Sequence, residues 1–207
     1  MALKYKRILL KISGEALGGE KGMGFDEPTM DAICGGVKKA HELGVQIGIV
    51  VGGGNFWRGR SSGKMERTLA DKIGMLATVM NALAVSDKLE QLGVPTEVFT
   101  SITMPQVAPA FTRKDALRAM DEGNPFFSTD TATALRAVEV SADVMFKATM
   151  VDGVYDKDPH KYPDAKKYDT LTFTKVLEDQ LAVMDGTAAT LCRDNKLPIL
   201  VFDLADP

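Results

Sequence analysis

Two lysines interrupt apolar stretches that have the character of buried strands. Lys11 lies near the end of residues 7–12, and Lys147 lies near the end of residues 143–149. A charged ammonium group inside a buried strand is costly unless an anion meets it. At a strand end, each ammonium group is placed to reach a phosphoryl group during its transfer. The plainer alternative is a lysine whose stem is buried while its ammonium group reaches the rim.

A run of three glycines, residues 52–54, follows the apolar stretch 45–51. Because glycine has no Cβ, the N–H groups of such a loop can close around a phosphate, with Arg58 as a cationic lid. A tight turn that needs positive φ is the alternative interpretation of three glycines. The sequence has neither a Walker A loop nor the glycine spacing of a dinucleotide-binding fingerprint.

A further candidate phosphate loop, residues 123–129, precedes a helix that begins near Asp130. Ser128 or Thr129 would serve as an ordinary N-cap, and Asp130 would complement the helix dipole. The same geometry presents free N–H groups to a phosphate, so capping and binding are compatible. Two lysines at strand ends and two glycine-bearing loops together predict a site for two phosphorylated molecules.

Strands and helices alternate along the chain, which is typical of an α/β fold with a mainly parallel sheet covered on both faces. Ligands of such folds bind at the carboxyl ends of the strands. The pattern predicts strands at 7–12, 45–51, 94–100, 143–149 and 198–203, and helices at about 27–43, 68–92, 112–122, 131–140, 174–182 and 186–195. One step breaks the alternation, because the helices on either side of residues 123–129 have no strand between them.

Composition bounds the class of protein. The 207 residues, 45% of them apolar, suffice for one compact domain. A net charge of −3, from 25 basic and 28 acidic side chains, gives no basic field suited to nucleic acid. We expect no membrane span and no signal peptide. Cys34 and Cys192 lie far apart without metal-ligand spacing, which indicates reduced thiols and a cytoplasmic location.

The motifs, taken in order, resemble those of the bacterial uridylate (UMP) kinases, members of the amino-acid kinase superfamily. The resemblance covers nearly the whole chain. Its most specific parts are the Gly-Met helix at residues 74–81 and the Asn-Pro-Phe-Phe loop at residues 124–127, and the others are residues 11–17, 52–55 with 58–59, and 151–155. It implies a three-layer αβα sandwich that transfers the γ-phosphoryl group of ATP to UMP in pyrimidine nucleotide biosynthesis.

The resemblance also implies roles for single residues. Residues of about 1–140 would form the acceptor-binding part of one domain, and about 141–207 the ATP-binding part. Implied ATP-binding residues are Lys11, Ser13, Gly14, Gly54, Arg58, Thr149, Tyr155 and Asp158. Implied UMP-binding residues are Gly53, Asp71, Gly123, Asn124, Pro125, Phe126, Phe127, Ser128 and Thr129. Implied catalytic residues are Lys11, Lys147, Asp130 and Arg58, with Asp130 orienting the lysines. Asp185 falls where relatives place a further acidic residue near the nucleotide.

Relatives carry features that this sequence lacks. They have a hydrophobic strand and a Gly-Thr step between the helix ending near Glu122 and the Asn124 loop, and they continue past Pro207. We therefore expect residues to be missing between 122 and 124 and after 207, since loss of a central strand would prevent folding. Relatives are commonly homohexamers activated by GTP and inhibited by UTP, and the apolar face of the 68–92 helix is a plausible dimer surface.

Chemistry favours the same activity. A phosphate acceptor has a second pKa near ~6, so it is already a dianionic nucleophile at neutral pH and needs no catalytic base. The reaction needs alignment of two anions and cations over the developing charge, which Lys11, Lys147, Arg58 and Mg²⁺ would supply. Phosphates would hold most of the Mg²⁺ coordination, with Asp130 or Asp185 acting through water.

Two alternatives remain open at this stage. One is a sibling kinase whose acceptor is a carboxylate or carbamate, although the Phe126–Phe127 pair and Arg58 suit a nucleotide better. The other is a non-catalytic nucleotide sensor with a decayed site, which retention of both lysines and Asp130 disfavours.

Overall fold

A parallel four-stranded sheet forms the centre of the protein in the computed structural model, which describes residues 3–57, 65–122, 130–149, 151–181 and 184–203. Its strand order is β2-β1-β3-β6, and all three ladders are parallel. The strands are β1 Arg7–Ile12, β2 Gln46–Val51, β3 Val144–Thr149 and β6 Ile199–Asp203. These bounds agree within one residue with four of the five predicted strands.

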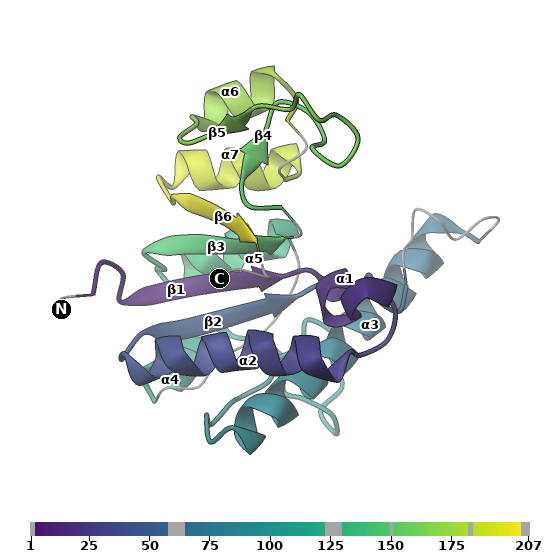
Figure 1. Ribbon diagram of the computed structural model, residues 1–207. Helices are drawn as coiled ribbons and strands as arrows, with labels where there is room; N and C mark the ends of the chain where they lie inside the picture. The colour runs from purple at the N-terminus through teal and green to yellow at the C-terminus, as the bar shows by residue number, and fades with distance from the viewer. Residues whose placement is uncertain (1–2, 58–64, 123–129, 150, 182–183, 204–207) are drawn as a thin grey trace.

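Helices cover both faces of this sheet (Figure 1). The helices are α1 Gly14–Leu17, α2 Glu27–Glu42, α3 Arg67–Gln91, α4 Arg113–Asp121, α5 Asp130–Glu139, α6 Phe173–Glu178 and α7 Gly186–Asp194, with a short 3₁₀ turn at Gly19–Lys21. On one face, α2 and α3 pack against Leu10 and Ile49 in one apolar cluster. On the other face, α4, α5 and α7 pack against Leu9 and Met145. The predicted three-layer αβα sandwich with a mainly parallel sheet is confirmed.

Local sequence signals explain where the helices begin and end. Asp26 caps α2 by accepting a hydrogen bond from the Thr29 N–H at 3.1 Å, and Gly44 follows the helix with a φ of 86°. Thr112 caps α4 in the same way through the Asp115 N–H. These polar and glycine positions are why the predicted helix limits lie close to the observed ones.

The predicted strand at 94–100 is wrong. Among the described residues, this stretch joins no ladder and forms only an isolated bridge between Thr100 and Ala110. The residues have the composition of a strand, and Val94 and Phe99 are buried. A strand, however, also needs a hydrogen-bonding neighbour, and the described sheet ends at β2 on this side. The composition of residues 94–100 correctly indicated that part of this stretch is buried. Whether they form a strand depended on a neighbouring strand to pair with.

Smaller elements were not predicted. The short helix α1 directly follows β1, and a two-stranded antiparallel ribbon pairs β4 Val154–Tyr155 with β5 Lys167–Tyr168. These elements are too short to give a periodic sequence pattern. The predicted 174–182 helix is observed as the shorter α6, which ends at Glu178.

The long helix α3 departs from the expectation that no apolar stretch is long enough to span a membrane. By length and composition alone it would be long enough, but in this fold it packs against α2 and β2. Its packed side carries the buried polar residues Asn81 and Ser86, which a fold-packed helix can satisfy with hydrogen bonds. The helix therefore gives only weak evidence for a membrane span.

Both cysteines are buried and unpaired, as the sequence predicted. Burial raises the pKa of each thiol, Cys34 and Cys192, to about 11. A thiol with such a pKa is protonated at neutral pH, so these two residues act as small core side chains.

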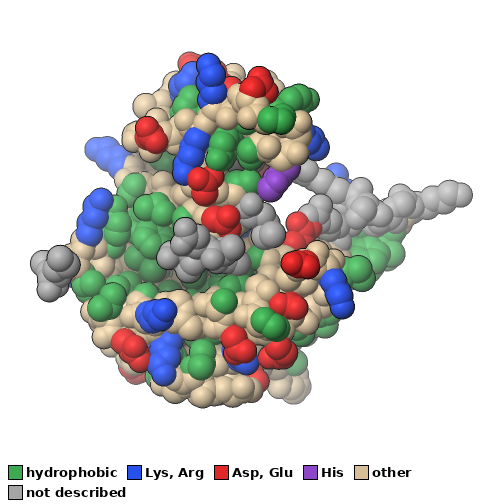
Figure 2. Space-filling model, in the orientation of Figure 1, with side chains coloured by type: hydrophobic (Ala, Val, Ile, Leu, Met, Phe, Trp, Pro, Cys, Tyr) green, Lys and Arg blue, Asp and Glu red, His purple; other side chains and the backbone are tan. Residues whose placement is uncertain are grey.

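An apolar surface lies between α2 and the α6–α7 part of the molecule (Figure 2). It forms a groove of about 440 Å³ whose walls include Ile33, Phe146, Leu200 and Phe202. Leu200 is 42% exposed there, because the described chain places no helix over β3 and β6 on this face.

The loops that follow β1 and β2 pack backbone to backbone. A Cβ built on Gly14 would lie 2.3 Å from the Gly52 carbonyl oxygen, and one built on Gly53 would lie 2.7 Å from the Gly74 carbonyl oxygen. None of the three glycines 52–54 has a positive φ, so the alternative of a positive-φ turn is wrong. The glycines at 14, 52 and 53 are needed for close approach, which joins these two loops and α3 into one unit.

This packing predicts that Gly14→Ala lowers the stability of the fold substantially. The new Cβ would overlap backbone atoms that cannot rotate away, which costs about 1–3 kcal/mol or more. For a chain of this size the melting temperature should fall by roughly 2–12 °C, measured by differential scanning calorimetry. Gly35→Ala is the matched control, since a Cβ on that α2 residue would meet nothing within 4 Å. Equal melting temperatures for the two variants would contradict the packing argument.

Candidate active site

The two lysines singled out in the sequence stand side by side in the sheet. Lys11 of β1 and Lys147 of β3 are direct partners in the parallel register. Adjacent strands lie about 4.8 Å apart, and paired residues of parallel strands point to the same face. That face is the one that carries Leu9 and Met145, as the strand alternation requires. Like charges on adjacent positions of one face repel each other where they approach, and an anion bound by both would offset that repulsion.

The register continues across all four strands. Val50 of β2 is the partner of Lys11, and Val201 of β6 is the partner of Lys147. Val50 comes shortly before the glycine loop, defined here as residues 52–55, and Val201 lines a pocket on the opposite side of the lysines. The lysine pair therefore lies between the loop after β2 and the pocket beside β6.

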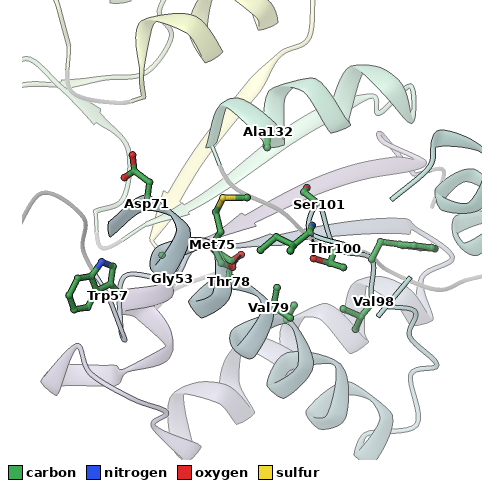
Figure 3. Close-up of a pocket in the computed structure, with 14 residues that line it drawn as sticks. Gly53, Trp57, Asp71, Met75, Thr78, Val79, Val98, Thr100, Ser101 and Ala132 are labelled. Carbon is green, nitrogen blue, oxygen red and sulfur yellow. Dashed lines mark hydrogen bonds between the residues drawn. The ribbon is translucent and has the colours of Figure 1, made fainter. Parts of the chain in front are cut away.

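On the β2 side, a cavity of about 470 Å³ lies between α3 and the 98–102 segment, with Gly53 of the glycine loop in its wall (Figure 3). It is called the acceptor-side pocket below. Gly53 and Asp71, two residues predicted to contact the acceptor, both line it. Other walls come from α3, the 98–102 segment and Ala132 of α5. Its volume is within the range of about 300–1,000 Å³ that is typical of small-molecule sites.

On the β3–β6 side, a second cavity of about 430 Å³ lies among β3, the β4 region and residues near the end of α6. It is called the donor-side pocket below. Its walls include Lys147, Thr149, Tyr155 and Asp158, and Asp179 and Val201 join them from later in the sequence. Three of these, Thr149, Tyr155 and Asp158, are the residues that the sequence assigned to the adenine and ribose of ATP. The structure thus places all three in the wall of one cavity.

Hydrogen bonds hold the polar groups of the donor-side pocket. The Tyr155 hydroxyl donates to Asp152 at 2.6 Å, and Lys167 Nζ donates to the same carboxylate at 2.7 Å. The hydrogen bond from Lys167 is the main reason that the pKa of Asp152 is lowered. The carboxylate in turn raises the pKa of Tyr155. The ring of Tyr155 is therefore fixed at its outer end, which suits a surface for stacking.

Asp158 is held as an ionised acceptor. Lys161 Nζ lies 3.2 Å from its carboxylate, and the His160 N–H donates to it at 3.0 Å. The Lys161 contact is the largest cause of its lowered pKa. A carboxylate in this state accepts hydrogen bonds, as a ribose hydroxyl requires.

Asp71 lies on α3, at the mouth of the acceptor-side pocket (Figure 3). Arg67, one turn earlier, has its Nε 3.7 Å from the Asp71 carboxylate. Both side chains are largely exposed, so this ion pair contributes little to stability. The Asp71 carboxylate is thus accessible to a ligand that enters the pocket.

Two helices begin at the carboxyl edge of the sheet, where the strands end. The helix α5 packs against β1 and β3 and leads into β3, and Ala132 in its first turn lines the acceptor-side pocket. A helix N-terminus carries partial positive charge and free N–H groups that favour phosphate. Asp185 caps α7 by accepting from the Ala188 N–H at 2.8 Å, which gives this residue a structural role.

Several predicted site residues fall outside the part of the chain that the structure describes. They are Arg58, Gly123, Asn124, Pro125, Phe126, Phe127, Ser128 and Thr129. The backbone of Asp130 is described, but its side chain is not. Their assigned roles stay predictions. Four other predicted ATP-binding residues are described. Lys11 lies near the end of β1, and the residues that follow the ends of β1 and β2 include Ser13, Gly14 and Gly54.

Sequence reasoning missed part of the lining. Trp57, Thr78 and the 98–102 segment line the acceptor-side pocket, and Lys157, Asp179 and Gln180 line the donor-side pocket. Thr78 lies within the Gly-Met helix motif, so that motif contained a signal for it. The 98–102 segment gave no such signal, because its place depends on how the chain packs after α3.

Comparisons with known proteins agree with this geometry. The profile of the Amino acid kinase family matches residues 6–203. Among solved structures, UMP kinase from Bacillus anthracis superposes with a TM-score of 0.93 at 34% identity, covering 98% of this chain and 89% of that one. UMP kinase from Ureaplasma parvum gives a TM-score of 0.89 at 33% identity, covering 97% and 91%.

A more distant structure shares the fold. Uridylate kinase from Archaeoglobus fulgidus superposes with a TM-score of 0.71 at 22% identity, covering 94% of this chain and 89% of that one. The family profile spans the lysine strands, the glycine loop and both pockets. The chain belongs to the amino acid kinase family.

Proposed function

We propose that the protein transfers the γ-phosphoryl group of ATP to UMP, yielding ADP and UDP. The observation that carries this proposal is the register that sets Lys11 beside Lys147, with one pocket on each side of the pair. The solved structures at 33–34% identity are UMP kinases, which supports UMP as the acceptor.

In the proposed reaction, ATP occupies the donor-side pocket and UMP the acceptor-side pocket. A phosphate oxygen of UMP attacks the γ-phosphorus in line, and the bond from that phosphorus to the β–γ bridging oxygen breaks as ADP leaves. No proton has to be removed, because the UMP phosphate is already a dianion near neutral pH. Lys11 and Lys147 stabilise the charge that develops on the transferred group. In this proposal Asp130 orients the two lysines, and Arg58 contacts the ATP phosphates.

Mg²⁺ is the cofactor that this reaction requires. Among the described residues, no three His, Cys, Asp or Glu side chains come together, which fits a cation held mainly by ATP phosphates. When bound, it neutralises phosphate charge. Asp130 and Asp185 begin α5 and α7 at the carboxyl edge and would contact it through water.

The biological setting follows from the proposed substrates. An enzyme that makes UDP from UMP belongs to pyrimidine nucleotide biosynthesis and acts in the cytoplasm. Activation by GTP and inhibition by UTP are part of this proposal, and the assay below tests the effect of GTP.

Phosphoryl transfer measured by coupled ADP release tests the proposed function. We expect UMP to be the best acceptor in a panel of UMP, CMP, dCMP, acetylglutamate, aspartate and carbamate, each measured with and without GTP. Transfer to a carboxylate or carbamate in preference to UMP would identify a sibling kinase. Absence of transfer to every acceptor would indicate a nucleotide sensor.

Lys11→Ala should lower turnover sharply. Removal of one group that stabilises transition-state charge typically costs about 10²–10³-fold in kcat. Binding of UMP should change little, and the emission of Trp57 can report it, because Trp57 lines the acceptor-side pocket and is the one tryptophan of the sequence. Lys38→Ala is the control, since it removes the same charge from an exposed α2 position. Unchanged kcat in Lys11→Ala would remove that lysine from the mechanism.

Asp71→Ala should act differently. Because Asp71 lines the acceptor-side pocket, its loss should raise the KM for UMP by roughly tenfold, equal to about 1.4 kcal/mol, and leave the KM for ATP unchanged. Steady-state kinetics with each substrate varied in turn separates the two constants. An effect confined to ATP would contradict this assignment.

The proposed homohexamer rests on the outer face of α3. Leu76, Met80 and Leu83 recur at helical spacing on this face, and Leu76 and Met80 are 45% and 49% exposed. The neighbouring Ala77 is buried against the fold, while these three side chains point outward. Apolar side chains exposed along one helix favour contact with a second copy.

Charge on this face should prevent assembly. The double variant Leu76→Glu/Met80→Glu should lower the mass measured by size-exclusion chromatography with light scattering, because two buried carboxylates would be unpaired. Met23→Glu, at another exposed apolar position, is the control. A wild-type monomer, or a double variant of unchanged mass, would contradict the proposed interface.

A further inference from the structure

Two buried asparagines lie beneath the glycine loop. Asn55 ends this loop and is 2% exposed, and Asn81 on α3 is 0% exposed. Asn81 Nδ2 donates to Asn55 Oδ1 at 2.7 Å, and Asn55 Nδ2 donates to Asn81 Oδ1 at 3.1 Å. We call this reciprocal pair the amide clasp.

The second N–H of each amide binds a main-chain carbonyl. Asn81 Nδ2 donates to the Gly52 oxygen at 2.6 Å, and Asn55 Nδ2 donates to the Gly24 oxygen at 2.7 Å. Because a carbonyl oxygen only accepts, these contacts fix which side of each amide is the nitrogen. All four side-chain N–H groups are used, so the clasp is a fully satisfied buried network.

The clasp holds the glycine loop at both of its ends. Asn81 contacts the carbonyl of Gly52, where the loop begins, and the side chain of Asn55, where it ends. Between them, the N–H groups of Phe56 and Trp57 donate to the Gly53 oxygen at 3.1 and 3.0 Å and close the turn. One side chain of α3 therefore contacts the loop at both of its ends, in addition to the backbone contact at Gly53.

That position matters for both proposed substrates. Gly53 lines the acceptor-side pocket and lies against the α3 backbone without room for a Cβ. Gly52 donates its N–H to the Ile12 oxygen at 2.9 Å and packs against Gly14, in the loop assigned to ATP phosphates. A shift of Gly52 would thus change the acceptor-side pocket and its distance from the lysine strand together.

We propose that Asn81 and Asn55 are positioning residues for phosphoryl transfer, acting through the glycine loop that they hold. This inference rests on the proposed function. Burying two amides is costly unless every hydrogen bond is made, and an apolar pair would fill the same space without that requirement. Unlike an apolar pair, the amides make directional hydrogen bonds. These bonds fix the orientation of two carbonyl groups, Gly24 and Gly52, from separate segments of the chain. A misplacement of about 1 Å in an active site can cost 100-fold in rate.

Asn81→Asp tests this role with almost no change in shape. The variant still accepts from Asn55 Nδ2 but places an oxygen against both the Gly52 carbonyl and Asn55 Oδ1, which should displace the loop. At about pH 8 we expect kcat/KM for UMP to fall up to about 100-fold, with the KM for ATP within roughly twofold of wild type. Titration of UMP against Trp57 emission gives the affinity independently of turnover.

Ser86→Ala is the matched control. Ser86 is also buried on α3 and shares a hydrogen bond with Thr96, away from the acceptor-side pocket. Both variants should lower the melting temperature, but Ser86→Ala should keep the wild-type constants for UMP. If Asn81→Asp also lowers only the melting temperature, the clasp is purely structural and the proposal is wrong.

The pH profile gives a second readout. Burial and the facing carbonyl should raise the pKa of the introduced carboxyl group, and its protonated form can again donate to Gly52. The activity of Asn81→Asp divided by that of wild type should therefore rise as pH falls from about 8.5 to about 6. This ratio cancels the titration of the UMP phosphate, of Asp71 and of Glu15, which lies beside Gly54. If this activity ratio does not change with pH, loss of the donor to Gly52 is not the cause of the lower activity.

Asn55→Asp serves if Asn81→Asp does not fold. It still accepts from Asn81 Nδ2 but loses the donor to the Gly24 carbonyl and to Asn81 Oδ1. The same split between UMP and ATP constants is therefore expected, and normal UMP constants would overturn the proposal. A wild-type protein that neither binds nor phosphorylates UMP would instead overturn the proposed function. Normal wild-type transfer with unaffected variants would overturn the clasp alone.

Discussion

The parallel register between β1 and β3 is the constraint on which the site depends. It brings Lys11 and Lys147 to adjacent positions on one face, although they are 136 residues apart in the sequence. Strand spacing of about 4.8 Å sets the two backbones side by side, so both side chains leave the sheet on the same face. The same ladder puts the glycine loop on one side of the pair and the donor-side pocket on the other. A change of one residue in this register would send one lysine to the opposite face.

Close backbone contact holds the loops that surround this pair. The glycines at 14, 52 and 53 permit contacts that any side chain would block, and the Asn55–Asn81 pair ties the same segment to α3. These contacts involve main-chain groups, so they fix the loops more firmly than exposed side-chain pairs would. The geometry of these loops thus depends on α3, a helix whose outer face also carries exposed apolar side chains.

This arrangement of the sheet and its loops suits transfer of a phosphoryl group between two anionic substrates. The chemistry needs cations and alignment rather than a proton acceptor, and the sheet edge supplies both. The polar groups of the donor-side pocket are held by neighbours, as with Tyr155 and Asp152, and so are set before a ligand arrives. The kinship with UMP kinases and the geometry therefore point to the same activity from separate observations.

The sequence by itself determined the α/β class, four strands, the limits of most helices and the identity of both lysines, because periodicity and capping are local properties. It also marked Gly53, Asp71, Tyr155 and Asp158, which the fold then divided between two pockets. Tertiary structure alone decided that residues 94–100 are not a strand, since pairing requires a neighbour. It alone showed that Asn81 reaches Gly52 and that the 98–102 segment lines the acceptor-side pocket. These contacts join residues far apart in the chain, so no local pattern encodes them.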